Sequence, residues 1–176
     1  MLFVKAQARP GDRVLVQGAG GGVSTAAIVL ARAAGMTVYV TSRDEAKRTR
    51  AVDLGARQAF ASGERLPERV EVVIETVGAA TFGHSIKSLL PGGACVVSGA
   101  TTGFGPPAEL NHIFAKQLRV LGASMGTRGE LAALIRMLEE TGTRPLVAAE
   151  HALEDGHRAY AQLRDGEVFG KLVLRM

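Results

Sequence analysis

Four glycines lie within five positions of the chain, at Gly18, Gly20, Gly21 and Gly22. They follow the short run VLVQ and precede the alanine-rich stretch VSTAAIVLARAAG. A strand that ends in a glycine-rich turn and continues into a helix presents bare backbone N–H groups and the positive end of the helix dipole. Because glycine has no side chain to hold an anion away, this turn predicts a cradle for a phosphate or pyrophosphate group.

The spacing of the small residues departs from the usual dinucleotide signature. No register gives a complete GxGxxG, and the register that we favour places Ala19, Gly21 and Ser24 at its three small positions. These residues are still compatible with a tight turn, a close approach to a ligand and helix–strand packing. The motif GxxxxGK(S/T) is absent, which argues against a P-loop. A glycine-rich turn without any ligand is the alternative.

Hydroxyl and basic side chains follow the next β-branched run, TVYVT. In a domain that binds NAD, an Asp or Glu stands about 20 residues after the glycines and accepts from the ribose hydroxyl. Here Ser42 and Arg43 occupy that place, with Asp44 next and Lys47 nearby. Hydroxyl, guanidinium and ammonium groups suit a 2′-phosphate, which a carboxylate would repel. The sequence therefore favours NADP(H) over NAD(H).

Two other classes of nucleotide-using enzyme fit the chain less well. A methyltransferase that uses S-adenosylmethionine also needs a carboxylate for the ribose hydroxyls. A short-chain dehydrogenase needs a Tyr-x-x-x-Lys pair, but Tyr39 is followed four positions later by Arg43, and Tyr160 by Arg164. Neither class is favoured.

The elements that would position these residues alternate along the chain. β-branched runs predict strands at 13–17, 37–41, 58–61, 70–75, 93–98 and 118–124, and amphipathic stretches predict helices at 22–34, 44–54, 79–90 and 109–116. Helices at 128–141 and 153–165, a strand within RPLVAAEHAL and a strand at 171–174 follow. The pattern predicts an α/β Rossmann fold, a doubly wound six-stranded parallel sheet of order 3-2-1-4-5-6 with helices on both faces.

Glycine and proline are expected to end several of these helices. Gly35 and Gly55 follow the last periodic residues of the first two helices, as C-terminal capping glycines do. The triplet PGG at 91–93 is expected to end the helix at 79–90.

Composition excludes several other functions. With a single cysteine, Cys95, the chain forms no internal disulfide, and its four histidines lie too far apart in sequence to suggest a metal site. The net charge of +4 is spread over the chain with few aromatic residues among the basic ones, a weak case for nucleic acid. No apolar run reaches the roughly 18 residues of a membrane helix, and no secretory signal is visible, so we expect a cytoplasmic protein without a membrane partner.

Several separated motifs resemble the cofactor-binding domain of the medium-chain dehydrogenase/reductase superfamily, particularly its quinone oxidoreductase-like and zinc-type alcohol dehydrogenase-like branches. They are RPGDRVLVQGAGGGVSTAAI, TSRDEAKRTRAVDLGA, VVIETVG, SLLPGGACVVSGATTG, FAKQLRVLGASMGT and GEVFGKLVLR. The resemblance implies hydride transfer, in a complete enzyme, to or from a quinone, enal, ketone or alcohol. The residues expected to bind the cofactor are Gly20, Gly21, Gly22 and Val23 at the pyrophosphate, Ser42, Arg43 and Lys47 at the adenosine ribose phosphate, and Val77, Gly78, Ser98, Gly99 and Ala100 at the nicotinamide half.

The resemblance also implies a partner. Full-length members are similar in having an N-terminal GroES-like domain, which supplies the substrate pocket and the catalytic zinc ligands or acid, and nothing in this sequence corresponds to it. The chain thus resembles a truncated enzyme, with an NAD(P)-binding Rossmann domain at 1–150 and a tail at 151–176 that packs on the GroES-like domain. We expect it to bind cofactor without catalysis, with no catalytic residue and no zinc of its own.

A homodimer is also expected, through the edge strand at 119–125. The alternative function is a non-catalytic nucleotide-sensing or interaction module with the same fold.

Overall fold

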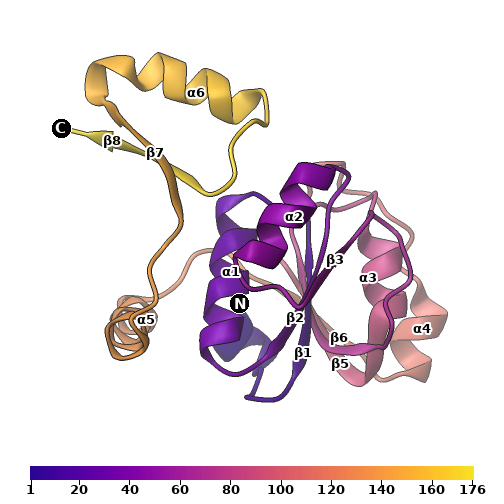
Figure 1. Cartoon of the computed structure of the whole chain (residues 1–176). Helices are drawn as coiled ribbons and strands as arrows, with labels where there is room; N and C mark the ends of the chain where they lie inside the picture. The colour runs from indigo at the N-terminus through magenta and orange to yellow at the C-terminus, as the bar shows by residue number, and fades with distance from the viewer.

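The computed structural model describes residues 1–176, and its centre is a parallel sheet with the strand order β3-β2-β1-β4-β5-β6 (Figure 1). This order confirms the predicted doubly wound fold. The first three strands extend the sheet to one side of β1, and the next three extend it to the other side. The strand order therefore reverses between β1 and β4, which is where α/β proteins of this class bind ligands. The strands are β1 (Arg13–Gln17), β2 (Thr37–Thr41), β3 (Gln58–Phe60), β4 (Val70–Glu75), β5 (Leu89–Val97) and β6 (Arg119–Gly122).

Helices cover both faces of this sheet, as predicted. Side chains alternate along β1, so that Val14 and Val16 enter one core while Leu15 enters the other. The first core holds Ile28 of α1 (Gly22–Ala33) and residues of α2 (Glu45–Asp53). The second holds Ile86 of α3 (Phe82–Ser88), and α4 (Leu110–Ala115) packs beside it. The chain begins with a π-helical turn, η1 (Leu2–Ala6).

Two glycine predictions have different outcomes. Gly35 and Gly55 follow α1 and α2 with φ of 75° and 120°, which confirms them as capping positions. The helix predicted at 79–90 is wrong at both ends, since α3 covers only Phe82–Ser88. The PGG triplet lies inside β5 instead of ending a helix. β5 begins at Leu89, which pairs with Val70, and its register against β4 shifts before the pairing resumes.

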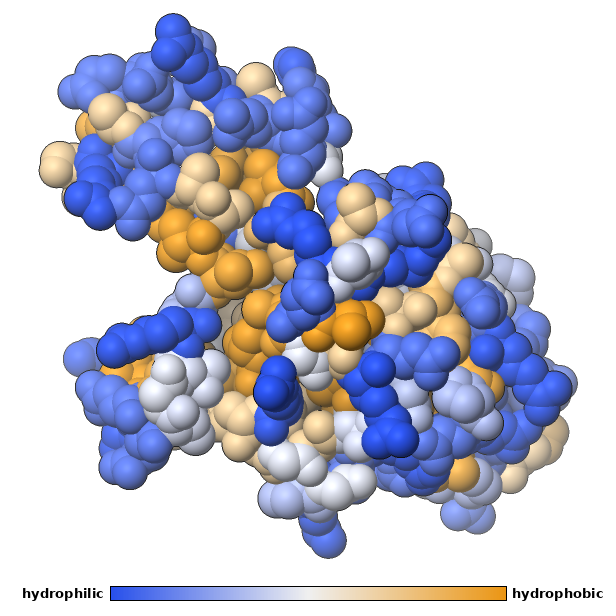
Figure 2. All heavy atoms as spheres, in the orientation of Figure 1, coloured by the Kyte–Doolittle hydropathy of each residue, from blue (hydrophilic) through white to orange (hydrophobic).

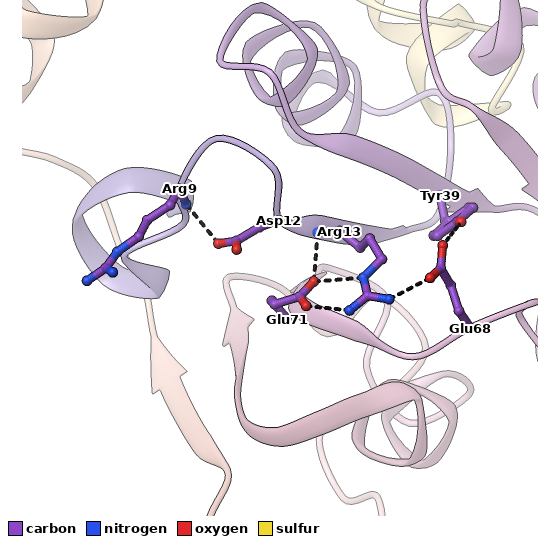
Figure 3. A network of polar contacts seen from close by, with 6 residues as sticks. All are labelled: Arg9, Asp12, Arg13, Tyr39, Glu68 and Glu71. Carbon is purple, nitrogen blue, oxygen red and sulfur yellow. Dashed lines mark hydrogen bonds and ion pairs between the residues drawn. The ribbon is translucent and has the colours of Figure 1, made fainter.

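A polar network closes the edge of the sheet where β1 and β4 begin (Figure 3). The Arg13 guanidinium donates to Glu71 and Glu68, with Nη2–Oε1 and Nη1–Oε2 distances of 2.5 Å each. The backbone N–H of Arg13 also donates to Glu71, and the Tyr39 hydroxyl donates to Glu68 at 2.5 Å. These contacts join β1, β2 and β4 at the end of the sheet opposite the glycine turn.

The chain after β6 leaves the sheet. α5 (Arg128–Thr141) has no buried residue. None of the helices combines the length and the apolar character that a membrane span requires. β7 (Val147–Ala152) and β8 (Lys171–Arg175) then form a separate two-stranded parallel sheet, connected by η2 (Leu153–Asp155) and α6 (Gly156–Arg164). Figure 1 shows this unit standing apart from the Rossmann sheet, and Figure 2 shows apolar surface on its underside. The domain boundary at residue 150 would fall within β7 and stays a prediction.

One side chain anchors the C-terminal unit to the Rossmann domain. Phe169 is only 2% exposed and belongs to the core beneath α1 and α2. The Arg50 guanidinium carbon lies 4.6 Å from the centre of its ring. The next residue, Gly170, donates its N–H to the carbonyl of Gly20 at 2.9 Å. The segment before β8 is therefore part of the structure around the glycine turn.

Candidate cofactor site

The glycine turn connects β1 to α1 in a conformation that side chains would obstruct. Gly18 and Gly20 have φ of 79° and 104°, a left-handed region that L-residues rarely adopt. A Cβ on Gly18 would lie 2.7 Å from Cγ2 of Val77, and one on Gly22 would lie 2.1 Å from Cε of Lys171. The absence of side chains therefore lets the segment after β4 and the start of β8 approach the turn.

Several backbone N–H groups at the beginning of α1 have no hydrogen-bond acceptor. The N–H groups of Gly18 and Ala19 donate to the carbonyl of Thr41, and the first helical bond runs from the N–H of Thr25 to the carbonyl of Gly21. The N–H groups of residues 20–24 have no acceptor in the protein. Together with the helix dipole, these donors fit an anionic pyrophosphate without rearrangement of the turn.

A cavity of about 790 Å³ opens directly beside this turn. Its size lies within the range of roughly 300–1,000 Å³ that is typical of small-molecule sites. It joins the glycine turn to the ends of β2, β3 and β4. Its lining consists of Gly18, Ala19, Gly21, Gly22, Val23, Ser24, Ser42, Arg43, Asp44, Lys47, Ser62, Thr76, Val77, Ala80, Thr81, Thr101, Thr102, Asp165 and Gly166.

The predicted cofactor residues divide between this cavity and the structure behind it. The cavity brings together Gly21, Gly22 and Val23 of the pyrophosphate group, all three residues expected at the ribose phosphate, and Val77. Gly20 lies in an adjoining cavity of about 330 Å³, beside Lys171. The residues of the prediction that line neither cavity are Gly78, Ser98, Gly99 and Ala100.

These remaining residues hold together the turns that follow β4 and β5. A Cβ on Gly78 would lie 2.6 Å from the carbonyl oxygen of Gly103, so the two turns touch through their backbones. The N–H of Ser98 donates to the carbonyl of Glu75 at 3.0 Å, and Thr102 donates its hydroxyl to the carbonyl of Val77 at 2.7 Å. Backbone contacts and hydrogen bonds therefore hold the turns after β4 and β5 together behind this side of the cavity.

The end of β2 presents one unpaired cation to the cavity. The Asp44 carboxylate caps α2 by accepting from the N–H of Lys47 at 3.1 Å, and the ammonium of Lys47 donates to the carbonyl of Gly166 at 2.5 Å. Arg48 donates to the carbonyl of Ser42 at 2.8 Å. The guanidinium of Arg43 makes no hydrogen bond or ion pair with the protein, although Arg43 lines the cavity. It is the basic group at this wall that is free to bind an anion.

Sequence reasoning missed the contribution of the C-terminal segment. Asp165 and Gly166 line the main cavity, and the side chain of Lys171 lies against Gly22 at the beginning of α1. The motif GEVFGKLVLR carries these residues, but only the tertiary structure brings them more than 100 positions back to the glycine turn. Lys171 forms no ion pair in the structure and places a cation where the pyrophosphate is expected.

The single cysteine, Cys95, is buried, and burial changes the reactivity of its thiol. Burial raises the pKa of the Cys95 thiol to about 12, which makes the free cysteine inert as a nucleophile. No group of three or more His, Cys, Asp or Glu side chains is close enough to hold a metal ion.

Comparisons with known proteins extend these observations. A family model described as "Zinc-binding dehydrogenase" matches residues 22–140. An acryloyl-coenzyme A reductase of Metallosphaera sedula is 32% identical over 97% of this chain and 52% of its own length. A quinone oxidoreductase of Mus musculus is 29% identical over 98% of this chain and 57% of its own. The chain thus spans about half the length of these relatives.

A solved structure gives the same picture. The crystal structure of an NAD-dependent alcohol dehydrogenase superposes with a TM-score of 0.89 and 33% sequence identity. The superposition covers 100% of this chain and 54% of the other.

Proposed function

The chain belongs to the zinc-binding dehydrogenase family, in which it corresponds to the cofactor-binding domain, and we propose that the cofactor it binds is NADP(H) rather than NAD(H). The observation that carries the proposal is the free guanidinium of Arg43 in the cavity beside the glycine turn. The neighbouring carboxylate, Asp44, is turned to the N–H of Lys47 as a helix cap. A 2′-phosphate at this wall would meet an unpaired cation, whereas the Asp44 carboxylate already uses one oxygen to cap α2.

The pyrophosphate would bind at the beginning of α1. The unpaired N–H groups of residues 20–24 support this position, and the helix dipole adds to their attraction for an anion. Lys171 places an ammonium group at the same point. Its charge would act on any dinucleotide, so it would raise affinity without distinguishing NADPH from NADH.

The two halves of the cofactor would extend in opposite directions from this point. The cavity extends from the ends of β2 and β3 on one side of β1 to Thr101 and Thr102, in the segment after β5, on the other. Val77 lies in this cavity, and Thr102 donates its hydroxyl to the carbonyl of Val77. We propose that Val77, Gly78, Ser98, Gly99 and Ala100 border the nicotinamide half.

The contribution of this chain to the reaction would be binding and orientation. A nicotinamide cofactor supplies hydride transfer when it is bound. The residues of the chain hold the phosphates, set the position of the adenosine half and shape the walls of the cavity. They offer no acid aimed at a substrate carbonyl, so we propose that this chain alone binds the cofactor without turning it over.

A complete enzyme would need a second domain for its substrate. The relatives, which are about twice as long, support a GroES-like domain as the partner. Their names support activated double bonds, quinones or alcohols as substrate classes. The exposed α5, with Leu131 and Ile135 at the surface, and the apolar underside of the C-terminal unit offer surfaces for this partner (Figure 2).

We also propose a homodimer through β6. This strand is an edge of the sheet and pairs only with β5, so its outer N–H and C=O groups are available to a second copy. Val120 in the strand is an exposed apolar residue that such a contact would cover.

The cofactor preference is tested by replacing the free cation. Arg43→Ala is expected to weaken NADPH binding about tenfold or more, and to leave NADH binding within about twofold, because only NADPH carries the 2′-phosphate. Calorimetric titration measures both affinities. Arg57→Ala, an exposed arginine outside the cavity, is the control. An unaltered NADPH-to-NADH affinity ratio in Arg43→Ala would contradict the proposed role.

A further inference from the structure

A chain of buried polar side chains crosses the sheet just behind the cofactor cavity. Gln17, Thr41, Glu75 and Ser85 all have an exposed fraction of 0%. They stand at the ends of β1, β2 and β4 and on α3. Buried polar groups cost stability unless each finds a partner, so their presence in the centre of an apolar sheet calls for a physical reason.

Gln17 is at the centre of this buried chain. Its Oε1 accepts from the hydroxyl of Thr41, and its Nε2 donates to Nδ1 of His84 at 2.9 Å and to Oγ of Ser85 at 3.0 Å. Burial lowers the pKa of His84, which favours a neutral ring, and its Nε2 then donates to the carbonyl of Glu64 at 2.9 Å. The amide of Gln17 thus ties β2 to α3 with both of its polar atoms in use.

Glu75 completes the chain on the β4 side. Its carboxylate accepts from Ser85 at 2.5 Å, from the Thr81 hydroxyl at 2.9 Å to each oxygen, and from the N–H groups of Val77 and Gly78 at 2.7 and 3.0 Å. No cation forms an ion pair with it. A buried carboxylate without a counter-ion is costly, and two of these bonds fix the backbone of the turn after β4.

The two ends of the chain reach opposite walls of the cavity. Thr41 directly precedes Ser42 and Arg43, which line the β2 wall, and Glu75 holds the turn that places Val77 on the β4 wall. Three side-chain hydrogen bonds connect them, from Thr41 to Gln17, from Gln17 to Ser85 and from Ser85 to Glu75, in addition to the backbone pairing of β1 with β2 and β4.

We propose that Gln17, Ser85 and Glu75 are positioning residues that set the spacing between the β2 and β4 walls of the cofactor cavity. The inference rests on the proposed function, since the walls matter to a dinucleotide that is bound between them. None of the three residues lines the cavity, so they act on the ligand through Ser42, Arg43 and Val77. Because the hydrogen bonds form one continuous chain, breaking it at either end should have the same consequence.

The test compares binding to the whole cofactor with binding to its adenosine half. NADPH and adenosine 2′,5′-bisphosphate are titrated into the full chain and into Glu75→Gln, Gln17→Leu and the double variant. Glu75→Gln keeps an acceptor for the backbone N–H groups but disturbs the bond with Ser85. Ile86→Val is the control, because Ile86 is fully buried beside Ser85 on α3 and lies outside the cavity.

Each single variant is expected to lower the affinity for both ligands about tenfold. The double variant should bind no more weakly than the weaker-binding single variant, because the same hydrogen-bond chain is broken in each case. The control is expected to bind within about twofold of the unmodified chain. Ser85→Ala, a smaller change, should give the same pattern if Glu75→Gln does not fold. Additive losses of affinity in the double variant, an equal loss in the control, or unchanged affinity in the folded variants would overturn this inference but not the proposed function. Failure of the unmodified chain to bind either ligand would overturn the proposed function and this inference with it.

Discussion

The ammonium group of Lys47 donates to the carbonyl of Gly166 across 2.5 Å, although the two residues are 119 positions apart in the chain. Lys47 lies on α2 and Gly166 just after α6, and both line the cavity beside the glycine turn. The C-terminal segment is therefore one of the walls of the cavity beside the glycine turn. A 2′-phosphate that recruits Lys47 must compete with this hydrogen bond, whereas the guanidinium of Arg43 is already free.

Lys171 should contribute to binding without contributing to specificity. Lys171→Met is expected to weaken NADPH and NADH by the same factor, about tenfold at low salt, because its ammonium lies at the place expected for the pyrophosphate. Titration at low and at high salt measures the effect, which should shrink as salt screens the charge. Lys5→Met is the control, since Lys5 is exposed and lies outside both cavities. A loss confined to NADPH would contradict this role.

Gly18 should tolerate a side chain less well than a glycine of similar conformation elsewhere. Gly18 and Gly92 have φ of 79° and 76°, but a Cβ on Gly18 would lie 2.7 Å from Val77, whereas one on Gly92 meets nothing within 4 Å. Gly92→Ala is expected to cost about 1 kcal/mol of unfolding free energy, and Gly18→Ala about 1–3 kcal/mol more. Urea denaturation compares the two. Equal losses would show that the backbone conformation alone sets the requirement for glycine.

Phe169 should hold the C-terminal segment against the glycine turn. Phe169→Ala is expected to lower the free energy of unfolding by about 3–5 kcal/mol, because the ring is buried in the main core and carries the Arg50 contact. Phe104→Ala, where the ring is 93% exposed, should change it by less than about 0.5 kcal/mol. Hydrogen exchange should also become faster at the N–H of Gly170, which bonds to Gly20. Similar stabilities for the two variants would argue against the anchor.

The Arg13 network predicts a pH-dependent contribution to stability. The hydrogen bond from Arg13 holds the pKa of Glu71 below its ordinary value of 4.5. The pair therefore stabilises the fold above that value and loses its contribution as the pH falls through the lower, folded-state pKa. Glu71→Gln is expected to cost about 1 kcal/mol at pH 7, a modest figure because the side chain is about a third exposed.

The difference between Glu71→Gln and the unmodified chain should then shrink as the pH is lowered past 4.5. Urea denaturation at several pH values follows it. A cost that is constant between pH 7 and pH 3 would mean that hydrogen bonding alone, without the charge, accounts for the effect.

The sequence was sufficient to predict the order of the strands and the place of the glycine turn. Both depend on local patterns: β-branched runs that alternate with amphipathic stretches, and glycines between a strand and a helix. The cavity also brings together Ser42, Arg43 and Lys47, which sequence spacing alone had associated. The start of β5 was not predictable in this way, because proline and glycine ordinarily interrupt a strand, and only pairing with Val70 shows that β5 already begins at Leu89.

Two parts of the site depend on contacts that local patterns do not carry. Gly166 lines the main cavity and Lys171 the adjoining one, and between them Phe169 inserts into a core with residues of α1 and α2, more than 100 positions earlier. Gln17 and Glu75 look like ordinary strand ends in the sequence, and their hydrogen-bond chain appears only when β1, β2 and β4 lie side by side against α3. Polar residues within a buried sheet are thus the places where the structure adds most to the sequence.

The most direct test of the account is calorimetric titration of the unmodified chain with NADPH and, separately, with NADH. The free guanidinium of Arg43 and the unpaired N–H groups of the glycine turn predict saturable binding of one molecule per chain, tighter for NADPH than for NADH. Absence of binding for both nucleotides, or tighter binding of NADH, would contradict it.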